Sequence, residues 1–154
     1  MCGIVFTNLE VTKKDFKNKW IYPLNHRGPD SSSCIFEKEG FFGHTRLSIV
    51  ELSSNSDQPY TDASGDILIY NGEIYNYKDL NFRYDLGLKG IYGDSQVLFN
   101  FLKKYGSSKL DQINGMFAFV FFSKSENSII CARDRFGVKP LFYSLKKSKL
   151  SVCS

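Results

Sequence analysis

Residues 116–122 read Met-Phe-Ala-Phe-Val-Phe-Phe, a short apolar run that is rich in aromatic side chains. Polar residues 123–127 follow it, and residues 128–132 are again mostly apolar. Two short apolar runs on either side of a polar connection predict two strands joined as a hairpin. We therefore expect a fold in which strands predominate.

Further strands are expected on both sides of this hairpin. They lie at residues 2–6, near 33–37, 41–44 and 67–70, at 140–143 and from 150 to 153. Residues 12–22 have the spacing of an amphipathic helix, with Thr12 as the N-cap, Phe16 and Trp20 on one face and Pro23 at its end.

A second amphipathic helix is expected to begin at Asp94 or Ser95, either of which can serve as its N-cap. Gly106 lies just past its end. Its apolar stripe consists of Val97, Leu98, Phe101, Leu102 and Tyr105. Strands that are buried on one face, combined with amphipathic helices, predict a layered α+β fold.

Length and composition restrict the class of protein. A chain of 154 residues that is 42% hydrophobic can bury one sizeable core, so residues 1–154 are expected to form one domain. The net charge of +4 is spread along the chain, and this distribution argues against a nucleic-acid partner. No apolar run approaches 18 residues, so no membrane partner is expected.

The cysteines indicate a reducing compartment. They stand at positions 2, 34, 131 and 153, without a Cys-x-x-Cys pair, so neither the usual zinc spacing nor a disulfide framework is present. The N-terminus also lacks the basic and then apolar segments of a signal peptide. We expect a cytoplasmic protein without a metal site.

Cys2 is the strongest candidate nucleophile. Removal of Met1 would leave its thiol beside a free α-amine, whose ordinary pKa is about 7.7–8.0. Such an amine can accept the thiol proton while the sulfur attacks a carbonyl carbon. Cys2 can therefore supply both the nucleophile and the base of an N-terminal-nucleophile reaction.

Five polar motifs follow Cys2 along the chain. They are His-Arg-Gly-Pro-Asp at 26–30, Gly-His-Thr-Arg-Leu-Ser-Ile at 43–49, Asn-Gly-Glu-Ile-Tyr-Asn-Tyr at 71–77, Gly-Asp-Ser at 93–95 and Ala-Arg-Asp-Arg-Phe-Gly-Val-Lys-Pro-Leu-Phe-Tyr at 132–143. In this order they closely resemble the class II glutamine amidotransferase domain of glutamine-hydrolysing asparagine synthetases. The resemblance extends from residue 1 to about residue 143.

The resemblance implies a four-layer sandwich of two antiparallel β-sheets between helical layers, the N-terminal-nucleophile hydrolase type, with Cys2 at the end of a central strand. It also implies hydrolysis of L-glutamine to glutamate and ammonia through a Cys2 thioester. No cofactor is expected in this domain. Because the chain stops inside an expected strand, we expect it to be a fragment of a longer chain.

In such a longer chain, the ammonia would pass to a C-terminal synthetase domain. That domain would use ATP and Mg²⁺ to amidate aspartate, as in asparagine synthesis, or a related carboxylate. The sequence determines neither the acceptor nor the oligomeric state, and a homodimer is compatible with it.

Asn71-Gly72 has two interpretations. The dipeptide is a strong signal for a hairpin turn, because both residues tolerate positive φ. Alternatively, the Asn71 side-chain amide and the Gly72 N–H group can stabilise an oxyanion. The Glu-Ile-Tyr-Asn sequence that follows, together with Cys2, favours the oxyanion site.

The remaining site residues are suited to a zwitterion. The Arg46 guanidinium matches the substrate α-carboxylate in a bidentate geometry, although a structural ion pair is the alternative. Asp94 and Glu73 are expected to bind the α-ammonium group. By resemblance, backbone groups in the same pocket come from Leu47 and Ile49.

Several residues have less direct roles. Arg27 is expected to position the loop near Cys2. His26 and His44 are alternative bases for the thiol, or else residues that serve packing. Residues 132–143 are assigned to structure and to the interface with the synthetase domain. Gln96, which replaces the acid that the family commonly has there, is expected on the helix surface.

Two other classes of function compete with this hypothesis. A glutamine-binding or regulatory module of the same fold would bind glutamine without turnover. A stand-alone hydrolase of another amide would act on substrates without an α-carboxylate and would not depend on Arg46.

Overall fold

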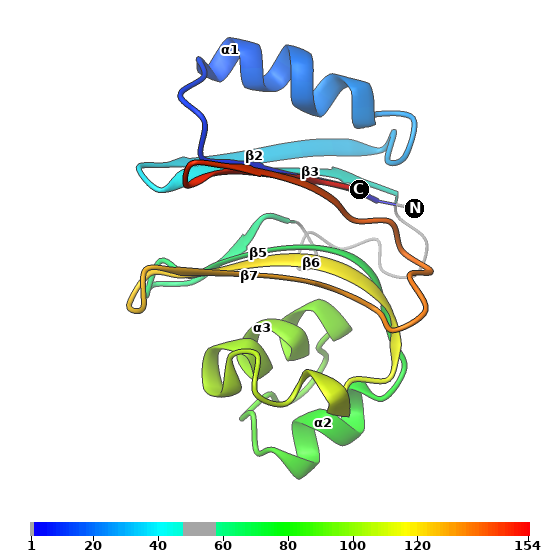
Figure 1. The fold of residues 1–154 in the computed structure, drawn as a ribbon. Coiled ribbons are helices and arrows are strands. Elements are labelled where there is room, and N and C mark those ends of the chain that lie inside the picture. Colours follow the sequence, from blue (N-terminus) through cyan, green and yellow to red (C-terminus); the bar gives the residue numbers. More distant parts are fainter. Residues whose placement is uncertain (1, 48–57) are drawn as a thin grey trace.

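Four layers stack in the computed structural model, which describes residues 2–47 and 58–154 (Figure 1). A helical layer covers a five-stranded sheet, a four-stranded sheet follows, and a second helical layer closes the stack. All strand pairs are antiparallel. The α+β four-layer sandwich expected from the sequence is thereby confirmed.

The first sheet has β1 at its centre. Its strands in spatial order are β2 (Ser31–Glu37), β3 (Gly40–Arg46), β1 (Gly3–Thr7), β9 (Lys149–Cys153) and β8 (Phe142–Lys146). The strand that follows Cys2 is thus central, as expected. The strand predicted at 140–143 begins only at Phe142, since Pro140 has no N–H group to donate to a strand ladder.

The first helical layer changes its geometry along its length. It consists of α1 (Lys13–Phe16), a π-helical turn η1 (Lys17–Ile21) and a 3-10 turn η2 (Tyr22–Leu24). Thr12 is the N-cap as predicted, because its hydroxyl accepts from the Asp15 N–H at 3.0 Å. The prediction that Pro23 ends the helix is wrong: Pro23 lies in the first turn of η2, where its missing N–H costs no helical hydrogen bond.

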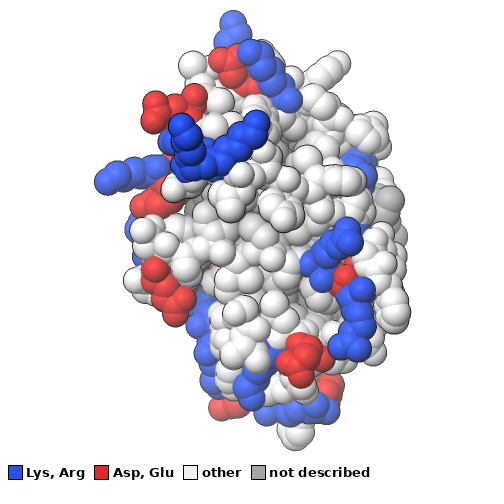
Figure 2. All heavy atoms as spheres, viewed as in Figure 1, with Lys and Arg blue, Asp and Glu red and all other residues white. Residues whose placement is uncertain are grey.

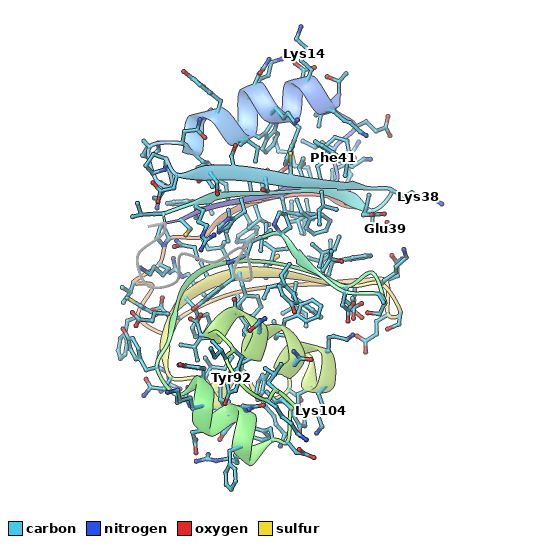
Figure 3. The ribbon with its side chains drawn as sticks, turned by 180° about the vertical axis from the view of Figure 1, so that it is seen from behind. Lys14, Lys38, Glu39, Phe41, Tyr92 and Lys104 are labelled. Atoms are coloured by element: carbon cyan, nitrogen blue, oxygen red, sulfur yellow. The ribbon has the colours of Figure 1, made fainter. Side chains whose placement is uncertain are left out.

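Aromatic side chains attach this helical layer to its sheet. Figure 3, drawn from behind, shows Phe41 between the two layers. The Phe41 ring lies 5.4 Å from that of Phe16 in an edge-to-face arrangement. This contact fixes α1 on the outer face of β3.

The second sheet contains the predicted hairpin. Its strands in order are β4 (Tyr60–Thr61), β5 (Ile67–Ile74), β6 (Gly115–Ser123) and β7 (Ser128–Arg133). On its outer face lie α2 (Tyr77–Arg83), α3 (Asp94–Tyr105) and a short 3-10 turn, η4 (Leu110–Gln112). Helix α2 was not predicted from the sequence, because Leu80 is its only buried residue and no apolar stripe stands out.

The start of α3 differs from the prediction. Gly93 is its N-cap, and Asp94 is already the first helical residue, so neither Asp94 nor Ser95 caps the helix. Gln96 is half-buried at the start of the helix, and its Oε1 accepts from the Gly93 N–H at 3.0 Å. Gly106 ends the helix at a φ of +56°, as predicted.

Strand alternation directs side chains of β1 to two different layers. Ile4 and Phe6 pack between the sheets, whereas Val5 packs against the first helical layer. Cys2, the residue before β1, has the same parity as Ile4 and Phe6. Its side chain therefore belongs to the inter-sheet side.

The same alternation operates in β5. Ile67 and Ile69 fill the space between the sheets, and Tyr70 packs toward α3. Asn71 has the parity of the two isoleucines, so its amide points between the sheets, toward the side that Cys2 occupies. Two side chains that are far apart in sequence thus face the same space.

Candidate active site

A cavity of about 660 Å³ opens where the start of β1, the second half of β5 and the start of α3 meet. Every site residue that the sequence predicted lies in its lining, except Arg27 and Ile49. Ile49 lies outside the described residues. The residues brought together are Cys2, Arg46, Leu47, Asn71, Gly72, Glu73 and Asp94.

Cys2 is held at the end of the central strand. β1 and β3 pair with Gly3 opposite Thr45, and continuing this register by one residue places Cys2 opposite Arg46. The Cys2 thiol donates to the carbonyl oxygen of Leu47 at 3.9 Å. The candidate nucleophile and the predicted guanidinium clamp are therefore neighbours across the two strands.

Asn71 and Gly72 do not form a turn. β5 continues through both to Ile74, with Asn71 opposite Ala118 and Gly72 opposite Phe117. A side chain at Gly72 would clash with the carbonyl oxygen of Met116. The close approach of β6 is therefore the reason for glycine here, and the hairpin interpretation is excluded.

The Asn71 side-chain amide is a buried hydrogen-bond donor. The residue is 2% exposed, and its Nδ2 has no hydrogen-bond partner among the described residues. A buried polar group in this state costs about 1–3 kcal/mol. Such a cost is explained if the amide is reserved for a ligand.

The Gly72 N–H points along the same edge of β5 as its neighbours two residues away. The Tyr70 N–H donates to Gln58 Oε1 at 2.6 Å, and the Ile74 N–H donates to Asp94 Oδ2 at 3.0 Å. Because N–H groups alternate along a strand, the Gly72 N–H is directed to this edge, where the cavity lies. Asn71 and Gly72 thus present two donors to the cavity.

Asp94 and Glu73 supply negative charge to the cavity lining. Asp94 Oδ2 accepts from the Tyr70 hydroxyl at 2.7 Å as well as from the Ile74 N–H. Burial, followed by the negative charge of Asp94, raises the pKa of the Tyr70 phenol above its ordinary value. Glu73 is exposed and lines the same cavity. Together with Arg46, the two acids provide charges of both signs, as a zwitterion requires.

Arg27 lies outside the cavity lining, but hydrogen bonds connect its turn to Gly3, the residue after Cys2. The hydroxyl of Thr45 accepts from the Gly3 N–H and donates to the carbonyl of Leu24, both at 3.1 Å. The Arg27 N–H donates to the same Leu24 carbonyl at 2.9 Å. This chain of hydrogen bonds joins the turn of Arg27 to the residue beside Cys2.

The two histidines differ in position. His26 is exposed, with Nδ1 2.7 Å from the carbonyl oxygen of Pro23, and it does not line the cavity. His44 is buried on the inter-sheet side of β3, opposite Ile4, and lines the cavity. Of the two alternative bases, the geometry leaves only His44.

Lys139 lies in the cavity lining although it is not among the site residues predicted from the sequence. It is 7% exposed and lines the cavity that contains Cys2. Assigning the whole of residues 132–143 to structure and interface is therefore wrong at this position. The reason is that Asp134 folds the segment back by accepting hydrogen bonds from the N–H groups of Val138 and Lys139. No local signal distinguishes Lys139 from a surface lysine.

Aromatic residues surround the cavity. Tyr92, labelled in Figure 3, lies in the connection between α2 and α3, and its ring contacts that of Tyr77 edge to face. Tyr75 and Ile91 complete this exposed side of the lining. These side chains share the lining with the charged groups of the cavity.

Comparisons with known proteins show the family to which the chain belongs. A family model described as a glutamine amidotransferase domain matches residues 1–154. The chain belongs to the glutamine amidotransferase domain family. This amidotransferase domain also shares its fold with the solved glutamine phosphoribosylpyrophosphate amidotransferase of Bacillus subtilis, with a TM-score of 0.79, 18% identity, and coverage of 99% of this chain and 41% of that one.

Curated relatives of the amidotransferase domain are longer proteins. A putative asparagine synthetase (glutamine-hydrolysing) of Methanocaldococcus jannaschii is 36% identical, over 93% of this chain and 32% of its own length. Asparagine synthetase 3 of Bacillus subtilis is 35% identical, over 96% and 25%. An amidase, chry2, of Gibberella zeae is 36% identical, over 85% and 20%. The chain therefore spans about a third or less of these relatives.

Two further features of the amidotransferase domain concern membranes and metals. Within residues 2–47 and 58–154, no helix combines the length and apolarity needed to cross a bilayer. The same described part of the chain contains no cluster of three or more His, Cys, Asp or Glu side chains with metal-binding geometry.

Proposed function

We propose that this domain hydrolyses L-glutamine to glutamate and ammonia through a thioester on Cys2. The observation that carries the proposal is the buried amide of Asn71, which has no partner among the described residues and faces the same space between the sheets as Cys2. An unpartnered donor beside a nucleophile is suited to a developing oxyanion.

The proposed reaction uses only groups of this chain, glutamine and water. Once Met1 has been removed, the Cys2 α-amine takes the thiol proton while Sγ bonds to the amide carbon of glutamine. Asn71 Nδ2 and the Gly72 N–H stabilise the oxyanion. The protonated amine then gives its proton to the leaving nitrogen, and ammonia and the thioester form. Water, deprotonated by the same amine, releases glutamate and restores the thiol.

Substrate selection follows from the charged groups of both signs in the cavity lining. We assign the α-carboxylate of glutamine to Arg46 and the α-ammonium group to Asp94 and Glu73. Backbone groups of Leu47 and Ile49 complete the proposed pocket. Arg27 is proposed to support the backbone around Cys2 through the Thr45 hydrogen bonds. Neither ATP nor Mg²⁺ takes part in this half-reaction.

The proposed destination of the ammonia is a synthetase domain in the same polypeptide, since the named relatives are asparagine synthetases several times longer than this chain. Amidation of aspartate or a related carboxylate would then use ATP and Mg²⁺ in the cytoplasm. Exposed apolar side chains between residues 136 and 145 support the presence of a partner. They are Phe136, Val138, Phe142, Tyr143 and Leu145.

The charge distribution supports a protein partner over a nucleic acid. Figure 2 shows basic and acidic side chains interspersed around the edge of one face, with a largely uncharged middle. This face has no continuous basic stripe of the kind that follows a phosphate backbone. We therefore retain the synthetase domain and glutamine as the proposed partners.

The test is glutamate release from glutamine by protein whose intact mass shows that Met1 has been removed. Turnover should disappear in Cys2→Ala and persist in the matched variant Cys34→Ala. Burial raises the pKa of the Cys34 thiol, so it is a poor nucleophile. If processed protein binds glutamine in calorimetry but releases no glutamate, the domain is a binding module and the proposal fails.

A further inference from the structure

We propose that Tyr70 is a positioning residue that makes the site selective for the α-amino group of its substrate. It does so by holding the Asp94 carboxylate in one orientation. The inference rests on the proposed function, because it concerns the part of that site which binds the α-ammonium group.

The two carboxylate oxygens of Asp94 have different surroundings. The Tyr70 hydroxyl donates to Oδ2 at 2.7 Å, and the Ile74 N–H donates to the same oxygen at 3.0 Å. Within the described part of the chain, these are the hydrogen bonds that the Asp94 carboxylate accepts. Both come from β5, so one oxygen is anchored to the sheet and Oδ1 is left for a ligand in the cavity.

Tyrosine suits this role because its hydroxyl donates a hydrogen bond without adding a positive charge. Burial and the charge of Asp94 raise the pKa of the phenol, so the hydroxyl stays protonated. A lysine in its place would neutralise Asp94 and weaken its attraction for an ammonium group. With tyrosine, the negative charge of Asp94 remains available to the substrate.

The side chain of Tyr70 lies on the opposite face of β5 from Asn71, the proposed oxyanion donor. Tyr70 is 3% exposed, and its ring packs in the core between the second sheet and α3. Asn71, the next residue, points to the opposite face of β5. Loss of the Tyr70 hydroxyl should therefore leave the oxyanion donors in place and disturb only the site for the α-ammonium group.

The experiment compares Tyr70→Phe with the wild type on two substrates, glutamine and glutaramate, which is glutamine without its α-amino group. For glutamine, kcat/KM should fall about tenfold, mainly through KM, as expected for a lost hydrogen bond to a charged group. For glutaramate it should not change. Tyr84→Phe is the control, because Tyr84 packs against the same core but makes no hydrogen bond to Asp94.

Equal losses on both substrates would show a merely structural role, and no loss on either would show that the hydroxyl is dispensable. Each result would overturn the inference. Calorimetric binding of both compounds to the Cys2→Ala variant, with and without Tyr70→Phe, tests it independently of turnover. A preference for glutamine that falls only in the double variant supports Tyr70, even if wild-type hydrolysis, and with it the proposed function, fails.

Discussion

Two buried polar residues flank the start of β6 and differ in how their hydrogen bonds are satisfied. Asp134, on one side, accepts from the N–H groups of Phe117, Phe136, Val138 and Lys139. Asn71, opposite Ala118 on the other side, has an amide nitrogen without a partner among the described residues. A satisfied buried group stabilises the fold, whereas an unsatisfied one lowers stability and is retained where a ligand completes it.

The largest expected effect concerns Asn71. In Asn71→Ala, kcat should fall by about 10²–10³-fold, because one oxyanion donor is removed. The thermal unfolding temperature should be unchanged or higher, since the lost amide nitrogen has no hydrogen-bond partner among the described residues. Steady-state kinetics and differential scanning calorimetry measure both quantities. A large loss of stability would contradict the view that the Asn71 amide does not stabilise the fold.

Asp134 should show the opposite behaviour. Asp134→Ala leaves buried N–H groups without an acceptor, and we expect it to lower the free energy of unfolding by about 3 kcal/mol or more. Denaturant titration measures this change. Asp111→Ala, at an exposed carboxylate, is the matched control and should have little effect. If the two variants are equally stable, the hydrogen bonds of Asp134 do not stabilise the fold.

The contribution of Asp134 should also depend on pH. Burial opposes its ionisation, but the four backbone N–H donors outweigh burial and hold its pKa below the ordinary value. A depressed carboxyl pKa stabilises the fold above the unfolded-state pKa of about 3.9, and this stabilisation is lost as the pH falls through the folded-state value. The stability difference between wild type and Asp134→Asn should therefore shrink below about pH 4. A difference that grows in acid would contradict this assignment.

Arg46 should have a smaller effect, confined to substrate binding. Arg46→Lys keeps the charge but loses the bidentate geometry, so KM for glutamine should rise about tenfold with little change in kcat. Steady-state kinetics on glutamine and on an amide without an α-carboxylate shows whether the loss depends on the α-carboxylate. Equal effects on both substrates would favour a hydrolase of another amide.

The smallest effect is expected at His44. If the Cys2 α-amine is the base, His44→Gln should lower kcat by less than about tenfold, whereas removal of a general base costs about 10²–10⁴-fold. Protein that retains Met1 should be inactive although His44 is intact. Activity in that form would transfer the role of base to His44.

Local sequence was sufficient for many elements. The β6–β7 hairpin, the Thr12 cap and the Gly106 end of α3 were predicted because each depends on neighbouring residues alone. Predictions were wrong where a distant partner changes the local preference. Asp94 is a good N-cap by residue type, but its carboxylate accepts from Tyr70 and Ile74 instead, and Gln96 supplies the capping hydrogen bond.

The sequence by itself determined the family, the candidate nucleophile and the residue types of a site for a zwitterion, because ordered motifs specify the chemistry of side chains. Only the tertiary structure decided which of those side chains meet. Strand alternation places Cys2 and Asn71 on facing surfaces of two sheets, and the turn around Asp134 brings Lys139 into the same cavity. These contacts join residues that are far apart in the chain, so no local pattern records them.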